Sequence, residues 1–302
     1  MSAGEAEALL TEKDADRAAR LACQAVGLDG IDVELIRLGH NALYRLPTTP
    51  AVVRVARRRD DWPRAEREVC LAAWLADVGV PAVRLWGSHR QPIEALERPV
   101  TFWEELSSPD GASSARDLGG LLAALHNVPT SPPCDLPGFD PLTVAEVRAR
   151  NATNLPNALT AVVLEQSARL RAAYRSLDFA LPAGVIHGDA YIGNVLHRGD
   201  GAPVLIDLEG MAVGPREWDL VPMAIAHRRF GLPETEWDAF VDAYGFDIQA
   251  WPGFEVLTAM REVMVTSWLM QLVDDRPGAL AEIETRIDSI REGDRARRWR
   301  PF

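Results

Sequence analysis

The 302-residue sequence is poor in lysine, in cysteine and in long apolar runs, and each shortage argues against a class of protein or site. Lys13 is the only lysine, so any site that normally uses lysine must use another residue. The three cysteines, Cys23, Cys70 and Cys134, are scattered and form no CxxC pair, which argues against a disulfide framework and a zinc site. No apolar run approaches the roughly 20 residues of a membrane-spanning helix.

An excess of positive charge is also absent, because the formal net charge is −12. This disfavours general nucleic-acid binding, which relies on basic surface. It is compatible with a cationic small substrate and equally with simple solubility. Residues 1–16 are acidic and polar, unlike a secretory signal, so we expect a cytoplasmic protein without a membrane partner. The composition does not indicate an oligomeric state.

Local patterns predict mostly strands before residue 107 and mostly helices after it. We therefore expect an α+β fold with a small, mainly antiparallel N-terminal lobe (1–106, including a first helix over 5–26) and a larger helical lobe (107–302). The expected strands lie within 31–46 and at 51–55, 83–86 and 100–103. The expected helices are at 61–78, 115–126, 142–152, 158–177, 214–227, 235–244, 254–273 and 279–291.

Candidate phosphate ligands occur in the predicted N-terminal lobe. Alternation along residues 51–55 places Arg54 on the opposite strand face from its valine neighbours, and it is either a phosphate ligand or a solvated arginine. Either Glu66 or Glu68 of the following helix could pair with it, although helix glutamates are usually solvated. The run Gly39-His40-Asn41 is either a backbone cradle for phosphate or an ordinary hairpin turn.

Residues 185–209 hold the most informative pattern, in which apolar runs end in polar groups and a turn signal lies between them. Asp189 and Asn194 are separated by four residues, as in the catalytic loop of protein kinases, and Asp207 follows the second run. Magnesium prefers oxygen ligands, which Asn194 and Asp207 supply, and Asp189 suits the role of catalytic base. Each residue alone could be a turn or capping residue, and their combination is far more specific.

Four neighbouring residues have supporting roles in this interpretation. His187 is expected to be a structural hydrogen bonder, because Asp189 already provides the base. Glu209 either reaches a second metal or shapes the loop, and we favour the loop. Asp219 is expected to tie the following helix to the catalytic loop, and His126 to be a cap or core residue.

The sequence resembles the aminoglycoside phosphotransferase / choline kinase family of small-molecule kinases, whose fold is similar to that of protein kinases. The resemblance extends from about Leu35 to the helices after Leu220. It rests on His187-Gly188-Asp189 with Asn194, on Ile206-Asp207-Leu208-Glu209, on Gly214-Pro215-Arg216-Glu217-Trp218-Asp219-Leu220, and more loosely on Leu118-Gly119 to His126, Arg67-Glu68 and Gly39, Asn41 and Tyr44.

The resemblance implies a two-lobed kinase fold that binds ATP and Mg²⁺. Asp189 would be the base, Asn194 and Asp207 the magnesium ligands, and Glu68 the partner of the strand cation. A hinge formed by Phe102, Trp103, Glu104 and Glu105 would bind adenine through backbone groups. Two departures stand out. Arg54 occupies the usual lysine position, where its forked charge can still bind phosphate, and Gly39 is the only glycine of the phosphate loop.

We therefore expect a phosphotransferase that transfers phosphate to a hydroxyl of a small molecule. The candidate acceptors are an aminoglycoside-like antibiotic, an amino sugar or a related cationic metabolite, and a role in antibiotic resistance would follow from the first. GTP remains a second candidate nucleotide. The alternative is a nucleotide-binding pseudokinase or scaffold, which the presence of Asp189, Asn194 and Asp207 disfavours.

Overall fold

The computed structural model describes residues 10–28, 32–39, 41–107, 113–128 and 131–302, and the chain divides into two compact units. The N-terminal unit comprises Met1–Ser113, Val128–Asp135 and Val195–Glu209. The C-terminal unit comprises Ser114–Asn127, Leu136–Asn194 and Gly210–Phe302. The units are therefore not contiguous in sequence, and the predicted functional lobes 1–106 and 107–302 stay a prediction.

The N-terminal unit is built on a five-stranded antiparallel sheet of order β1-β2-β3-β5-β4. A two-stranded β7–β8 hairpin joins the same unit, closed by the predicted turn at residues 198–201. The elements are α1 (Glu12–Ala25), β1 (Glu34–Leu38), β2 (Asn41–Arg45), β3 (Ala51–Ala56), a 3-10 turn (Arg59–Asp61), α2 (Trp62–Asp77), β4 (Ile93–Ala95), β5 (Arg98–Glu104), β7 (Val195–His197) and β8 (Pro203–Leu205).

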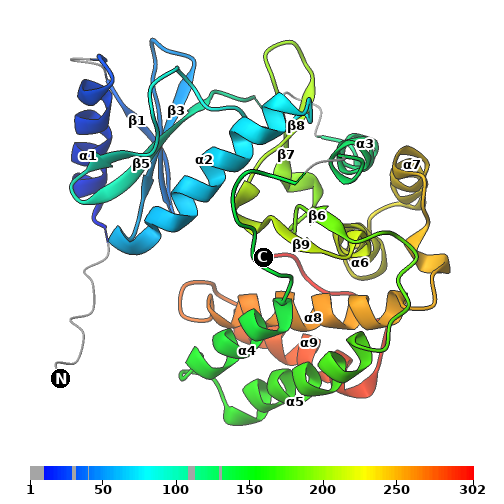
Figure 1. Ribbon diagram of the computed structural model, residues 1–302. Helices are drawn as coiled ribbons and strands as arrows, with labels where there is room; N and C mark the ends of the chain where they lie inside the picture. The colour runs from blue at the N-terminus through cyan, green and yellow to red at the C-terminus, as the bar shows by residue number, and fades with distance from the viewer. Residues whose placement is uncertain (1–9, 29–31, 40, 108–112, 129–130) are drawn as a thin grey trace. The chain divides into compact units, whose positions relative to one another are not determined.

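Successive side chains of β3 point to opposite faces of the sheet and pack against different elements. Val53 and Val55 are fully buried in a core that includes the small residues of α1 and Phe102 of β5. Arg54 faces the other side, where it meets α2. Figure 1 shows α1 and α2 on opposite sides of the sheet. The predicted orientation of Arg54 is thus confirmed, and it follows from the period-two geometry of a strand.

One predicted strand is wrong and one strand was missed. Residues 83–86 form no regular strand and make a single bridge, Leu85 to Trp103, beyond the part of β5 that pairs with β4. β4 lies in the segment expected to be a loop. Its hairpin turn uses positive φ at Leu96 (51°) and Glu97 (60°), without the glycine or asparagine that normally signals such a turn.

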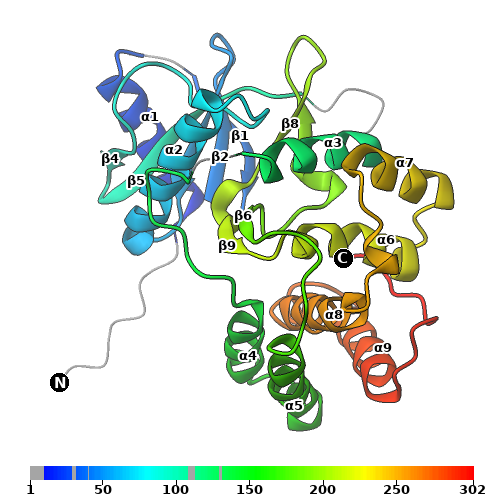
Figure 2. The same cartoon turned by 45° about the vertical axis from the view of Figure 1, so that its right-hand side comes forward.

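The C-terminal unit is mainly helical and contains a short β6–β9 pair. Helices α4, α5, α8 and α9 pack against one another, and Figure 2 shows them as one bundle. The elements are α3 (Ala115–His126), α4 (Pro141–Asn151), α5 (Asn157–Tyr174), β6 (Gly184–Ile186), a 3-10 turn (Ile192–Asn194), β9 (Ala212–Gly214), a 3-10 turn (Arg216–Leu220), α6 (Val221–Phe230), α7 (Glu234–Tyr244), a 3-10 turn (Ile248–Ala250), α8 (Phe254–Met270) and α9 (Ala279–Glu292). A further 3-10 turn (Leu208–Gly210) lies where the chain passes between the units.

Helix α3 illustrates how closely sequence and structure agree in this unit. It begins at a capping box in which Ser114 accepts from the N–H of Asp117, and its leucines at 118, 121, 122 and 125 are buried. The helix expected from residue 214 instead starts with the 3-10 turn and continues as α6 from Val221, with Pro222 in its first turn. Among the described residues, no helix has the length and apolar character needed to cross a membrane.

Candidate active site

Asp219 holds the backbone of the predicted catalytic loop in the C-terminal unit. Its carboxylate accepts the N–H of His187 at 2.6 Å and the N–H of Gly188 at 2.8 Å. His126 Nε2 lies 3.0 Å from the same carboxylate, which can only accept, so we place the imidazole proton on this nitrogen. The expected tie between Asp219 and the loop is therefore present in the structure.

Burial and hydrogen bonding act in opposite directions on this buried cluster. Burial alone raises the pKa of Asp219, but the hydrogen bond from His126, the charge of His126 and the contacts with His187 bring that pKa below its usual value. Tyr244 lies behind His126, with its hydroxyl 2.8 Å from Nδ1, and burial raises the pKa of this phenol. Asp219 is thus an ionised, fully hydrogen-bonded anchor, and His126 belongs to its support.

Position 188 requires a glycine, both because its φ is positive and because the backbone of Gly210 lies close to it. Its φ is +83°, and a Cβ at this position would lie 2.1 Å from the carbonyl oxygen of Gly210. Trp218 Nε1 donates to the Gly188 carbonyl at 2.9 Å. The peptide on either side of Gly188 is therefore fixed, and this fixes the start of the segment that carries Asp189.

Asp189 and Asn194, the predicted base and metal ligand, lie on one turn. The Asn194 side-chain nitrogen donates to the Asp189 carbonyl at 2.9 Å, and the Asn194 N–H donates to the Tyr191 carbonyl at 2.9 Å. This arrangement leaves the amide oxygen of Asn194 as the group suited to a cation. Asn194 is buried, whereas the Asp189 side chain is 43% exposed and thus accessible to a substrate.

Arg261 of α8 is a residue of the site that the sequence interpretation missed. Its Nη2 lies 2.5 Å from Asp189 Oδ1, and its guanidinium stands 5.8 Å from the Trp218 ring centroid. Arg148 of α4 also acts electrostatically on this pair. The available signal was a charged residue in the middle of the apolar stretch that forms α8, since such a residue is rarely buried without a partner.

In the N-terminal unit, Arg54 and Glu68 form an ion pair, as the resemblance implied. Glu66, the other candidate, is exposed on the same helix. The Arg54 guanidinium also lies 5.2 Å from the Trp103 ring centroid. Burial lowers the pKa of Arg54, and the carboxylates of Glu209 and Asp207 raise it. The ion pair is present, while the role of both residues in nucleotide binding stays a prediction.

Asp207 has backbone geometry that is unusual for a residue other than glycine. Its φ is +61°, a conformation that costs of order 1 kcal/mol and is concentrated at functional sites. Next to it, Glu209 pairs with Arg64 of α2 at 2.5 Å. The conformation of Asp207 is compatible with a functional carboxylate, and its role as a magnesium ligand stays a prediction. The pairing of Glu209 agrees with the loop-shaping role.

The predicted hinge, Phe102 to Glu105, forms the end of β5 and the residue after it. The side chains of Phe102 and Trp103 are buried. An adenine base that binds here must use carbonyl groups or displace existing bonds, because three backbone donors already have partners in this unit. These bonds are Phe102 N to Gln91 Oε1 (2.6 Å), Glu104 N to Arg84 O (2.9 Å) and Glu105 N to Pro50 O (3.0 Å).

The predicted phosphate cradle falls partly outside the described residues, because His40 is not among them. The Gly39 N–H donates to the Asn41 carbonyl at 3.0 Å, and Arg57 donates to the Gly39 carbonyl at 3.0 Å. Asn41 itself begins β2. The hairpin alternative accounts for these bonds, and phosphate binding by Gly39 and Asn41 stays a prediction.

The donor set fits magnesium on chemical grounds. Among the described residues, no group of three or more histidine, cysteine or acidic residues could hold a metal ion by itself. One amide oxygen (Asn194) and one carboxylate (Asp207) are a small set of hard ligands, as expected where nucleotide phosphates and water complete the coordination. The structure brings Asp189 and Asn194 together in one unit, and Asp207 belongs to the other.

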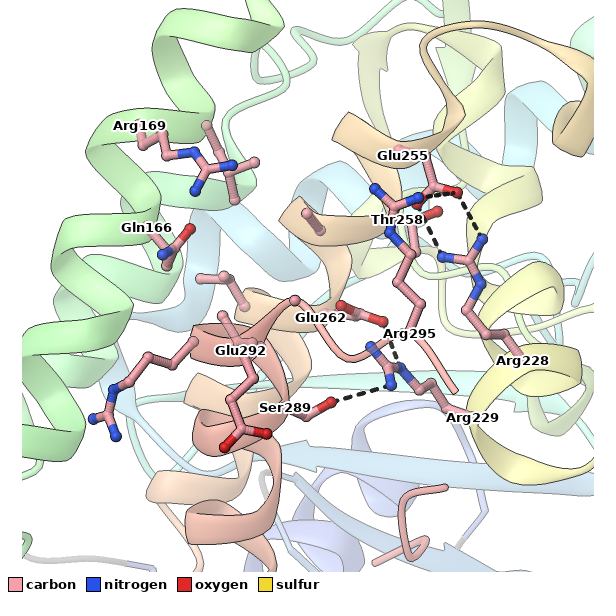
Figure 3. A pocket seen from close by; sticks show the side chains of 16 residues that line it. Gln166, Arg169, Arg228, Arg229, Glu255, Thr258, Glu262, Ser289, Glu292 and Arg295 are labelled. Atoms are coloured by element: carbon pink, nitrogen blue, oxygen red, sulfur yellow. Dashed lines mark hydrogen bonds and ion pairs between the residues drawn. The ribbon is translucent and has the colours of Figure 1, made fainter. Parts of the chain in front are cut away.

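A cavity of about 330 Å³ in the C-terminal unit contains none of the predicted site residues. Figure 3 shows it lined by charged side chains that bind one another. Arg229, which is buried, binds Glu262 at 2.6 Å and Ser289 at 3.1 Å, and Arg228 binds Glu255 at 2.9 Å. These pairs connect helices, so we assign the lining a structural role.

A family model described as "Phosphotransferase enzyme family" (APH) matches residues 32–257, which is most of the chain. The chain belongs to this family. It is therefore a phosphotransferase, and the match includes the turn that carries Asp189 and Asn194, the Arg54–Glu68 pair and Asp207. A search of curated proteins found no match.

Solved structures of small-molecule kinases share the fold at low sequence identity. Amicoumacin kinase hAmiN, with AMP-PNP, Ca²⁺ and Ami, has a TM-score of 0.69 and 13% identity, over 89% of this chain and 90% of that one. The microcompartment-associated aminopropanol kinase has a TM-score of 0.68 and 20% identity, over 92% of this chain and 98% of that one. A choline/ethanolamine kinase family protein from Mesorhizobium loti has a TM-score of 0.61 and 20% identity, over 94% of this chain and 100% of that one. The α+β, protein-kinase-like fold is thereby confirmed.

Proposed function

We propose that the enzyme transfers the γ-phosphate of ATP, in the presence of Mg²⁺, to a hydroxyl group of a small molecule. The observation that supports this most is the catalytic turn. It offers a half-exposed carboxylate at Asp189 on a backbone fixed by Asp219, with Asn194 bonded to the same turn. Phosphoryl transfer requires this kind of fixed placement more than covalent chemistry.

In the proposed reaction, the hydroxyl oxygen of the acceptor forms a bond to the γ-phosphorus while the bond to the β–γ bridging oxygen breaks. ADP leaves, and Asp189 orients the hydroxyl and accepts its proton. Arg54, held by Glu68, is proposed to bind phosphate oxygens, and the segment 102–105 to meet the adenine. Asn194 and Asp207 are the proposed magnesium ligands, and the ion when bound neutralises phosphate charge.

The nucleotides bound in related structures support a nucleotide substrate without selecting one. The amicoumacin kinase holds AMP-PNP and an aminoglycoside phosphotransferase holds GDP with kanamycin. We propose ATP and retain GTP as the second nucleotide to test. The related structures include complexes with kanamycin and with spectinomycin, and an aminopropanol kinase. An aminoglycoside-like antibiotic, an amino sugar or a related amine thus remains a candidate, with antibiotic resistance as the consequence in the first case.

The test is a mass-spectrometric screen for the gain of one phosphate on hydroxylated antibiotics, sugars and amino alcohols with Mg-ATP. D189A should lower kcat about 10²- to 10⁴-fold, the usual contribution of a general base, while calorimetric binding of Mg-ATP persists. D238A is the matched control, because Asp238 is an exposed aspartate on α7 of the same unit. Retained turnover in D189A would remove Asp189 as the base. Nucleotide binding without transfer to any acceptor would favour the scaffold alternative.

A further inference from the structure

Two arginines from different helices act on the proposed catalytic base, Arg261 through an ion pair and Arg148 through its charge. Arg261 is in the middle of α8 and its Nη2 binds Asp189 Oδ1 at 2.5 Å. Arg148 is in the last turn of α4, and α4 and α8 pack directly against each other. Asp189 and Arg261 are the groups that act electrostatically on Arg148. The base is therefore accompanied by two guanidinium groups and not one.

Arg148 differs from its neighbours in having no partner of its own. Its carbonyl accepts the N–H of Ala152, but among the described residues its half-buried side chain makes no hydrogen bond or ion pair. Arg150, two residues further along α4, pairs with Glu146, which also binds Arg171 of α5. Burial lowers the pKa of Arg148, Asp189 raises it and Arg261 lowers it. A desolvated guanidinium without an ion-pair partner is costly, and a ligand anion relieves the cost.

Arg261 adds a second unsatisfied donor. Its side chain is 8% exposed, and its Nη1 is buried without a hydrogen-bond partner among the described residues. Two guanidinium groups thus act on the one carboxylate of Asp189. The carboxylate of Asp219 supports the same loop, but its charge is already met by two backbone N–H groups and His126. The net charge of −12 of the whole chain therefore does not describe the groups that act on Asp189.

We propose that the acceptor carries an anionic group, a carboxylate or a phosphate, that binds Arg148 while its hydroxyl faces Asp189. Arg261 holds the Asp189 carboxylate through Oδ1 and adds its charge to the same patch. The inference rests on the proposed phosphotransferase function and narrows its substrate class. It differs from the cationic acceptor expected from the net charge, but it includes zwitterions, in which an amine accompanies the anion.

The experiment compares acceptors in triplets that share a carbon skeleton and most hydroxyl groups and differ in one charged group. D-glucose, D-glucuronate and D-glucosamine, which share the pyranose ring, form one triplet. Corresponding polyols, hydroxy acids and amino alcohols form others, with sugar phosphates as dianions. Transfer of phosphate from Mg-ATP is measured by mass spectrometry and by ADP release. Acid members are expected to accept phosphate in preference to their neutral and amine counterparts.

Variants of α4 then test the assignment of Arg148. R148Q should raise KM for the preferred acid about tenfold or more, the value of one lost charge-assisted hydrogen bond, with KM for ATP unchanged. R148K should raise KM for the acid less than R148Q does, because lysine keeps the positive charge. R150Q is the matched control on the same helix, since Arg150 already pairs with Glu146.

The outcomes separate the inference from the function on which it rests. Transfer only to neutral or amine members, or an unchanged KM in R148Q, overturns the anionic acceptor and leaves the phosphotransferase proposal standing. Absence of transfer to every compound counts against both proposals. Binding of Mg-ATP, measured by calorimetry without an acceptor, tests the nucleotide part independently.

Discussion

The charged side chains of the two units differ in how completely they are paired. In the N-terminal unit, Arg54 and Glu68 form a buried pair in which each charge has a partner, and the Trp103 ring covers the guanidinium. In the C-terminal unit, Asp189 is half-exposed, Arg261 binds its carboxylate and the charge of Arg148 also acts on it. In the N-terminal unit, Glu68 can thus hold the Arg54 guanidinium in position. In the C-terminal unit, arginine charge stays available to a ligand, which is what we expect where an acceptor must be selected.

The same contrast exists within the C-terminal unit, between Asp219 and Asp189. Asp219 is fully buried and accepts from two backbone N–H groups and an imidazole, so it has no capacity left for chemistry. Asp189 has one strong partner and an exposed carboxylate. We therefore expect Asp219 to support the loop and Asp189 to act in catalysis.

Replacing Asp219 should have the largest effect. D219N keeps the shape but removes a charge that three donors surround, and it should lower the free energy of unfolding by about 3–5 kcal/mol. The measurement is urea unfolding followed by circular dichroism. Because the pKa of Asp219 is depressed in the folded state, its contribution is fully present above the unfolded pKa and disappears as pH falls through the folded pKa.

The difference between wild type and D219N should therefore be constant near neutral pH and shrink on acidification below about pH 4, the usual aspartate range. D238N, on the exposed surface of α7, is the matched control and should change neither stability nor its pH dependence. A stability difference that grows on acidification would contradict the assignment of Asp219 as an ionised anchor.

Breaking the buried pair of the N-terminal unit should have the next largest effect. E68Q leaves Arg54 without its neighbouring charge and should cost about 3 kcal/mol of stability and weaken Mg-ATP binding. R54Q with E68Q should recover part of the stability but not the nucleotide affinity. E66Q is the control, because Glu66 is exposed on the same helix. Equal nucleotide affinity in wild type and R54Q would contradict the phosphate-binding role of Arg54.

The sequence predicted those parts of the fold and site that depend on local pattern. The face of Arg54 followed from strand alternation, α3 from its cap and leucine spacing, and Asp189 with Asn194 from one short motif. The pattern of helix α2 left Glu66 and Glu68 open, the resemblance implied Glu68, and the structure shows Glu68 in the ion pair. β4 was missed because its turn uses Leu96 and Glu97 in place of residues that favour positive φ.

Arg148 and Arg261 were missed for a different reason. They lie 41 and 72 residues from Asp189 in the chain, so their approach depends on the packing of α4 against α8 and not on a motif. A buried arginine inside an apolar helix signals a partner, but the sequence does not identify that partner. The residues that we propose for acceptor recognition could therefore be found only in the tertiary structure, whereas the local sequence predicted the reaction class.

The smallest of these effects is expected at Arg261, and it is also the most specific. R261Q removes the bond that holds Asp189 Oδ1 but leaves the carboxylate in place, so kcat should fall about tenfold, the value of one charge-assisted hydrogen bond, with KM for ATP unchanged. R261K should keep part of the rate, and R276Q, an exposed arginine of the same unit, should have none of the effect. Single-turnover measurement of phosphate transfer separates this loss from product release. Because R148Q is expected to change acceptor KM and R261Q to change kcat, a variant of Arg261 that altered KM alone would show that it binds the acceptor and does not position the base.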